Sequence, residues 1–427
     1  MGKTLAEKII AAHNVDGGPD GAAEVSAGDL VTVSVDVVMA NDVTAPIAID
    51  SFNAIGVEHV FDRDRVMLVP SHFAPNKDIK SAEQTRTLTR FAEAQVLENR
   101  FQVGRAGIEH VVLPERGLVL PGDLVVGGDS HTCTYGALGA FATGMGSTDI
   151  GFAMATGKTW LKVPETMKFV YYGERQEWVY SKDMILRTIG EITVDGALYR
   201  SMEFTGPGVA ALNMSERLTM TNMVIEAGGK CGFIPFDDTT REYVEARATR
   251  PYTPFYADDD ARYVSVHELD LSEMEPQVAC PYSPDNVHPI SQIKPEKVDQ
   301  VFIGSCTNGR FEDMAIVADI LQRTGREFNP DVRVMIIPGS QAVYLDMLRQ
   351  GWLELFTLAG AAVSTSTCGP CLGGHMGVLA ADEVCVSTSN RNFRGRMGHR
   401  DARVFLANPA VAATSAIMGR LAHPAEL

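Results

Sequence analysis

Apolar residues gather in short runs along the chain, and each run gives way to a polar loop or to a stretch with helical spacing. The spacing predicts a helix over residues 4–13, a β-rich run over 30–39 and a strand over 66–69. The same order returns later, where strands are predicted over 301–304 and 384–387. Buried-type strands that alternate with helices are typical of parallel sheets. The pattern therefore predicts an α/β fold.

Three rounds of strand, polar residue and helix indicate three similar α/β units. We place their boundaries at residues 1–125, 126–285 and 286–427. Residues 276–295 contain five prolines and little periodicity, so this stretch is predicted to be a linker.

The charge of the chain narrows the class of partner. Its 37 basic and 54 acidic side chains give a net charge of −17, without a basic block. Nucleic acid binding needs a positive surface, so the charge argues against a nucleic acid partner. An anionic substrate would need a few local arginines.

The number of cysteines and the lengths of the apolar runs indicate the cellular compartment of the protein. No apolar run reaches the length of a membrane span, and the charged start over residues 1–8 does not resemble a secretory signal. Seven cysteines, an odd number, favour a reducing compartment in which thiols stay free or bind metal. We expect a cytoplasmic protein without a membrane partner.

Polar residues stand directly after several predicted strands. The carboxyl ends of parallel strands are where α/β sheets place their binding sites. Helix or turn capping is the alternative for Asn41, Asp42 and Ser71. The polar groups are Asn41-Asp42, Ser71-His72 and Asp129-Ser130-His131.

Asn222 and Glu226 stand four residues apart in a helix predicted from Ser215 onwards. This spacing places both on one helical face. The surrounding sequence, which includes Met220 and Met223, is unusually apolar for an acid, although a solvated face is the alternative.

Two closely spaced cysteines form the most informative motif. Cys368-Gly369-Pro370-Cys371 lies in a loop of small residues, and Cys306 follows a predicted strand sixty-two positions earlier. With His375 these residues could bind zinc, and the pair alone could be a redox centre. The third hypothesis is a 4Fe-4S cluster bound by three thiolates, which leaves one iron without a protein ligand. The remaining cysteines are expected to be buried, inert thiols: Cys133, Cys231, Cys280 and Cys385.

Four motifs in this order resemble those of the aconitase superfamily. The chain is similar, from about residue 4 to 421, to large subunits of the isopropylmalate dehydratase and homoaconitase branch. The motifs are Asp129-Ser130-His131-Thr132, Gly304-Ser305-Cys306-Thr307-Asn308-Gly309-Arg310, Cys368-Gly369-Pro370-Cys371-Leu372-Gly373 and Asn390-Arg391-Asn392-Phe393. The resemblance implies three similar three-layer α/β/α domains around a cluster cleft, without the mobile fourth domain.

The resemblance also implies an activity and a partner. The chain would be the large subunit of a hydro-lyase that dehydrates and rehydrates a hydroxy di- or tricarboxylate. Isomerisation of 2- and 3-isopropylmalate in leucine biosynthesis is favoured over homoaconitase or a 2,3-dimethylmalate-type dehydratase. A separate small subunit would supply the mobile domain and its catalytic serine base. An RNA-binding iron sensor and a zinc-stabilised structural protein are the alternatives from other classes.

The resemblance assigns roles to individual residues. His72 and His110 would handle the proton of the leaving hydroxyl, with Asp129, His131 and Glu226 beside the cluster as further catalytic groups. One departure concerns Ser71, because many relatives carry an acidic residue immediately before this histidine. The implied cluster ligands are Cys306, Cys368 and Cys371, and the implied substrate-binding residues are Asn41, Ser130, Asn222, Asn390, Arg391 and Arg396.

Overall fold

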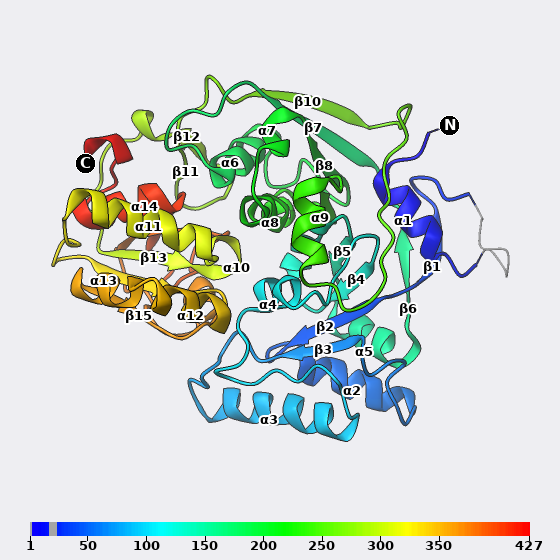
Figure 1. The fold of residues 1–427 in the computed structure, drawn as a ribbon. Helices are drawn as coiled ribbons and strands as arrows, with labels where there is room; N and C mark the ends of the chain where they lie inside the picture. Colours follow the sequence, from blue (N-terminus) through cyan, green and yellow to red (C-terminus); the bar gives the residue numbers. More distant parts are fainter. Residues whose placement is uncertain (1, 17–23) are drawn as a thin grey trace.

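The structure, a computed structural model, describes residues 2–16 and 24–427 (Figure 1). Its first sheet is parallel throughout and has the strand order β3-β2-β4-β5. Helices α2 (Ala45–Ile55) and α3 (Ile79–Ala94) pack together along one side of this sheet, at the bottom of Figure 1. The strands are β2 (Val37–Asn41), β3 (Val66–Val69), β4 (Leu124–Gly127) and β5 (Phe141–Gly144).

A second parallel sheet has the order β10-β7-β8-β9. Its connections include α6 (Ser181–Ile192) and α8 (Met214–Asn222), whose apolar faces contribute to the largest buried core. The strands are β7 (Thr166–Tyr172), β8 (Ser201–Thr205), β9 (Cys231–Phe233) and β10 (Ser265–Asp270).

The third sheet has seven strands in the order β12-β11-β17-β16-β13-β14-β15. The five strands from β17 to β15 are parallel, whereas β11 and β12 add antiparallel pairs at one edge. The parallel strands are β13 (Gln300–Gly304), β14 (Arg333–Ile337), β15 (Ala361–Val363), β16 (Val384–Ser387) and β17 (Arg403–Leu406). The helices include α11 (Phe311–Thr324), α12 (Gln341–Arg349), α13 (Trp352–Leu358) and α14 (Pro409–Met418).

The linker predicted over 276–295 is wrong. Within it, β11 (Gln277–Ala279) and β12 (Val287–Pro289) pair with each other, and β11 also bonds to β17. The edge strand β12 can contain Pro289, because an edge strand needs hydrogen bonds on one side only. The β-rich run predicted over 30–39 also divides, since β1 (Leu30–Ser34) pairs instead with β6 (Lys158–Lys162).

The predicted α/β class is confirmed by these sheets. Every residue of β2, β3, β4, β13 and β16 is buried, as expected for parallel strands covered on both faces. The boundaries at residues 125 and 285 stay predictions, because strand pairing does not mark where a domain ends. Residue 125 itself lies within β4, which pairs with β5 in one sheet.

Three short helical segments meet where the sheets face one another. These are α4 (Glu109–Glu115), the end of α8 and α10 (Ser305–Asn308), which lie near the centre of Figure 1. Within the described part of the chain, no helix combines the length and the apolar character that crossing a membrane requires. The polar strand ends that the sequence singled out converge on this centre.

Candidate active site

Asp42 fixes the loop that carries His72. The two oxygens of its buried carboxylate accept hydrogen bonds from the backbone N–H groups of Ser71 (2.8 Å), His72 (2.8 Å) and Phe73 (2.7 Å). The carbonyl oxygen of Ser71 in turn accepts a bond of 2.8 Å from the N–H of Cys368. The first sheet thereby holds both a histidine and the cysteine loop of the third.

The carboxylate of Asp129 contacts three histidines. His110 Nε2 lies 2.9 Å from Oδ1, His72 Nε2 lies 3.4 Å from Oδ2, and His131 bonds Oδ1 through its backbone N–H at 2.8 Å. Asp129 also caps the 3₁₀ helix η1 (Ser130–Leu138) that follows β4. Burial would raise the pKa of this carboxyl, but the hydrogen bonds from His110, His131 and His72 hold it well below its ordinary value. Asp129 is therefore an anion in the folded chain.

His110 is held from both ring nitrogens. Its Nδ1 lies 3.1 Å from the hydroxyl of Tyr135, while Nε2 faces Asp129. His110 is buried in the first turn of α4. The ring is thus fixed in orientation by partners from η1 and from the loop before it.

Glu226 joins His131 to Arg391. Its Oε1 lies 2.9 Å from Nε2 of His131 and 2.8 Å from Nε of Arg391. Burial would raise the pKa of Glu226, but Arg391 and His131 outweigh it and lower the pKa. Burial and Arg391 likewise oppose charge on His131, yet Asp129 and Glu226 raise its pKa.

The prediction that Asn222 and Glu226 share one helical face is wrong. Helix α8 ends at Asn222, and Glu226 belongs to the 3₁₀ helix η2 (Met223–Ala227). The changed winding directs the amide of Asn222 to Cys306 and the carboxylate of Glu226 to His131. The apolar surroundings predicted for this acid are confirmed, since Met220 and Met223 are both buried.

The three predicted ligand cysteines are buried and free. Cys306 lies in α10, directly after β13, and Cys368 and Cys371 flank the start of the 3₁₀ helix η4 (Gly369–Leu372). Polar N–H groups point at the sulfurs. Asn222 Nδ2 lies 3.2 Å and Asn390 Nδ2 3.5 Å from Cys306 Sγ, and Arg396 Nη2 lies 3.6 Å from Cys371 Sγ.

A buried amide pair ties these loops together. Asn390 Nδ2 lies 3.3 Å from Oδ1 of Asn222, and both side chains bond Thr307, whose hydroxyl donates to Asn222 at 2.8 Å. Buried amides need partners on all sides, so this network fixes their orientation. Ser130 stands at the edge, with Oγ 3.5 Å from Nδ1 of His131.

The charge balance around the sulfurs fits a metal cluster. Burial and the nearby Cys371 raise the pKa of Cys306 to about 12, so this thiol ionises only beside a cation. The hydrogen bond from Cys368 and the charge of Arg396 instead hold the pKa of Cys371 well below its ordinary value. Thiolates with N–H donors and the half-buried Arg396 match the environment that iron–sulfur clusters use.

A single zinc ion fits these residues less well. In residues 2–16 and 24–427, the one set of three ligand atoms within 4.8 Å of one another is His72, Glu109 and Asp129, so the three sulfurs are spread more widely. A tetrahedral zinc site would hold its sulfurs closer than that. His375, the fourth ligand considered from the sequence, places Nε2 3.2 Å from the carbonyl oxygen of His72.

Glu109 is a further acid beside His72, which the pattern of strand ends does not single out. Its side chain is fully buried, Oε1 lies 3.8 Å from Nδ1 of His72, and Asn41 Nδ2 donates to Oε1 at 3.0 Å. Burial alone would lower the pKa of His72, but Glu109 and Asp129 raise it to about 9. A signal did exist, because Glu109 is the one charge within an apolar run directly before His110.

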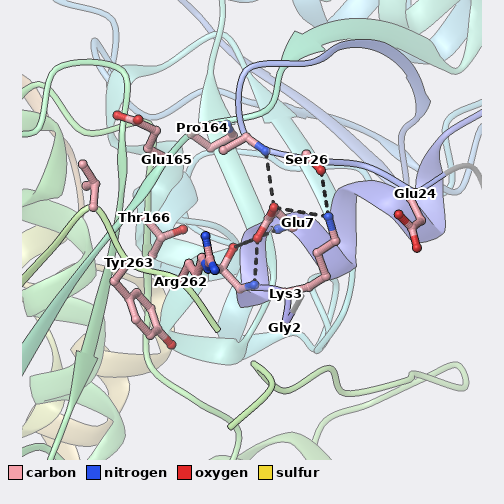
Figure 2. A pocket seen from close by; sticks show the side chains of 13 residues that line it. Gly2, Lys3, Glu7, Glu24, Ser26, Pro164, Glu165, Thr166, Arg262 and Tyr263 are labelled. Atoms are coloured by element: carbon pink, nitrogen blue, oxygen red, sulfur yellow. Dashed lines mark hydrogen bonds and ion pairs between the residues drawn. The ribbon is translucent and has the colours of Figure 1, made fainter. Parts of the chain in front are cut away.

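A separate hollow lies far from these residues. It has a volume of about 450 Å³ and opens between the start of α1 (Leu5–His13), the start of β7 and residues 262–264 (Figure 2). Glu7 in its wall completes the capping box of α1 by accepting the N–H of the N-cap residue Thr4 at 2.9 Å, and it lies 3.7 Å from Nζ of Lys3. None of the described residues that line it is a predicted site residue.

Known proteins match this chain over nearly its whole length. The family model of the aconitase family (aconitate hydratase) matches residues 7–419. The chain is 58% identical to the 3-isopropylmalate dehydratase large subunit of Halothermothrix orenii, over 100% of both chains. It is 57% identical to the protein of that name from Hydrogenobaculum sp., over 100% of this chain and 99% of the relative. Among solved structures, aconitase X (holo-form) of Thermococcus kodakaraensis has a TM-score of 0.49 at 13% identity, covering 87% of this chain and 88% of that one.

Proposed function

This chain belongs to the aconitase family, and we propose that it is the large subunit of a hydro-lyase that interconverts 2- and 3-isopropylmalate. The observation that carries the proposal is the meeting of three histidines on Asp129 beside three buried cysteines. The choice of substrate is supported by full-length relatives at 53–58% identity, all named for this dehydratase. The activity belongs to leucine biosynthesis.

The aconitase family implies a 4Fe-4S cluster, and we propose that Cys306, Cys368 and Cys371 hold it. Three ligands leave one iron without a protein ligand, and this open iron supplies a Lewis acid for the substrate hydroxyl. The amides of Asn222 and Asn390 stabilise the negative charge on Cys306. All seven cysteines are free, which suits a reducing compartment such as the cytoplasm.

Arg391 and Arg396 bind the substrate carboxylates in this proposal. Nε of Arg391 is engaged by Glu226, while the two Nη groups have no acceptor among the described residues. Nε of Arg396 is buried without a hydrogen-bond partner. A planar guanidinium can bond both oxygens of a carboxylate, and a buried unpaired donor is stabilised when one arrives. These two arginines supply the local positive charge that the acidic chain needs for an anionic substrate.

His72 and His110 handle the proton of the leaving hydroxyl. Because the pKa of His72 is raised to about 9, its imidazolium is the dominant form at neutral pH and can donate a proton. Asp129 keeps both rings aimed by accepting from one nitrogen of each. Removal of the carbon-bound proton is assigned to a base on a separate small subunit.

The experiment is a substrate panel on the two-subunit enzyme. The chain is combined anaerobically with its small subunit, the cluster is reconstituted, and the unsaturated intermediate is followed by ultraviolet absorbance. Turnover of isopropylmalate in preference to homocitrate and 2,3-dimethylmalate is expected. Turnover of homocitrate or dimethylmalate without isopropylmalate would contradict the substrate, and iron-free, zinc-containing protein would contradict the reaction class.

A further inference from the structure

His72 lacks an acidic neighbour in the sequence. Ser71 precedes it, and the Ser71 hydroxyl lies 3.0 Å from Nδ1 of the ring. A serine can exchange a hydrogen bond with an imidazole but brings no charge to stabilise an imidazolium. A histidine that donates protons needs that support when it is buried.

A carboxylate nevertheless reaches the same nitrogen from another element. Glu109, the first residue of α4, places Oε1 3.8 Å from Nδ1 of His72. The side chain is 0% exposed, and Asn41 Nδ2 is the donor that bonds Oε1, at 3.0 Å. Oε2 is buried and has no hydrogen-bond partner among the described residues. A buried carboxylate with so few donors is unstable unless a cation faces it.

Of the two histidines near Glu109, His72 is the one whose ring nitrogen is free to pair with its carboxylate. The neighbouring His110 is 3.9 Å from Oε1, but its two nitrogens already face Tyr135 and Asp129. Nδ1 of His72, by contrast, has a hydroxyl as its other neighbour. The pairing that leaves fewest groups unsatisfied therefore joins Glu109 to His72.

The other acids around His72 have separate tasks. Both carboxylate oxygens of Asp42 accept hydrogen bonds from the backbone N–H groups of residues 71–73. Asp129 faces the opposite ring nitrogen, Nε2, at 3.4 Å and is shared with His110 and His131. Only Glu109 stands at the nitrogen that Ser71 also touches.

We propose that Glu109 is the positioning residue of His72, and that its carboxylate supplies from α4 the negative charge that residue 71 does not carry. The proposal rests on the proposed function insofar as it assigns His72 a proton-transfer role. It predicts that the charge is interchangeable between positions 71 and 109, because both face Nδ1 of one ring.

The test moves the charge between the two positions. Glu109→Gln keeps the size of the side chain and the contact with Asn41 but removes the charge, and Ser71→Asp restores a charge beside the ring. In the reconstituted two-subunit enzyme, Glu109→Gln is expected to lower kcat roughly 10-fold or more, with KM for isopropylmalate changed less than about 3-fold. The double variant Ser71→Asp/Glu109→Gln is expected to recover most of the lost kcat.

Glu115→Gln is the matched control. Glu115 is a half-buried carboxylate at the end of α4, bonded to the hydroxyl of Ser340 at 2.9 Å and outside the site. It should leave kcat unchanged, which separates loss of charge at His72 from loss of any acid in this helix.

A second readout does not depend on turnover. The ring ¹⁵N signals of His72, assigned with His72→Gln, are titrated in the full chain without cluster. Glu109→Gln should move the midpoint of His72 down by about one pH unit or more, and Ser71→Asp should move it back. An unmoved midpoint, or a double variant that restores neither midpoint nor kcat, overturns the proposal. Absence of hydro-lyase turnover in the parent enzyme contradicts the proposed function instead, while the midpoints still decide the pairing.

Discussion

Nζ of Lys182 donates a hydrogen bond of 2.9 Å to the carbonyl oxygen of Thr388, although 206 positions separate the two residues. Lys182 comes from α6 beside the second sheet, and Thr388 directly follows β16 of the third. The same nitrogen also bonds the carbonyl of Ser389 and, at 3.3 Å, Oδ1 of Asn308. One buried lysine side chain thus holds the loop before Asn390 and the loop after Cys306.

Replacing Lys182 should loosen both loops. Lys182→Met leaves two buried carbonyl oxygens without a donor, and we expect the free energy of unfolding to fall by about 2–4 kcal/mol. Urea unfolding of the purified chain measures this. Lys230→Met is the control, because Lys230 is only partly buried and contacts a single carbonyl, that of Gly144, at 3.5 Å. Equal stability of the Lys182 variant and the parent would refute the proposal that Lys182 holds the two loops.

Asp129 should be the most sensitive carboxylate in the chain. Asp129→Asn keeps the size of the side chain but removes the charge that orients His72, His110 and His131. We expect kcat to fall roughly 100-fold or more, with the cluster retained. Steady-state kinetics and iron analysis check both parts, with exposed Asp50→Asn as the control. A variant that keeps more than a tenth of the parent kcat would exclude the proposed role of Asp129.

Cys368 should be required for the cluster. Cys368→Ser is expected to lose bound iron and sulfide after anaerobic reconstitution, because two sulfurs cannot hold the cluster that three hold. Cys280→Ser, at a half-buried thiol outside the site, should retain both. Unchanged iron content in the Cys368 variant would disprove the ligand assignment.

Glu115 gives the stability of the chain a pH dependence. Burial raises its pKa to about 7, although Ser340 and Arg310 oppose the rise, whereas the ordinary value is 4.5. Between these values the folded chain keeps a proton that the unfolded chain has released, so the free energy of unfolding should fall as pH rises. Glu115→Gln should therefore be more stable than the parent by about 1–3 kcal/mol at pH 8 and equal to it near pH 4.5.

Urea unfolding at the two pH values checks this prediction. Glu83→Gln removes an exposed carboxylate on α3 and should match the parent at both. A parent chain as stable as the Glu115 variant at pH 8 would show that Glu115 ionises without cost.

The parts of this architecture that the sequence predicts are those with local signals. Strand β3 and helix α1 follow from apolar spacing, and Cys306 stands out because it comes just after a buried strand. The strands β11 and β12 carry no such signal, since β11 joins the sheet by pairing with β17, which lies more than a hundred residues later. Proline content alone therefore made them look like a linker.

In the site, too, residues with local sequence signals are predictable and contacts between distant elements are not. His72, Asp129 and the cysteines are marked in the sequence by their places after strands or in a motif. Glu109, which faces Nδ1 of His72, lies on another element, thirty-seven residues away. No local pattern links Ser71 to Glu109, because their relation arises only when α4 packs against the loop after β3. The winding change at Asn222 is likewise a tertiary effect, which the four-residue spacing to Glu226 conceals.

The most direct measurement is the rate of absorbance change with isopropylmalate for the reconstituted chain, with and without its small subunit. We expect turnover when both polypeptides are present and none for this chain alone, because the base that takes the carbon-bound proton is assigned to the partner. Full turnover by this chain in the absence of any second polypeptide would contradict it.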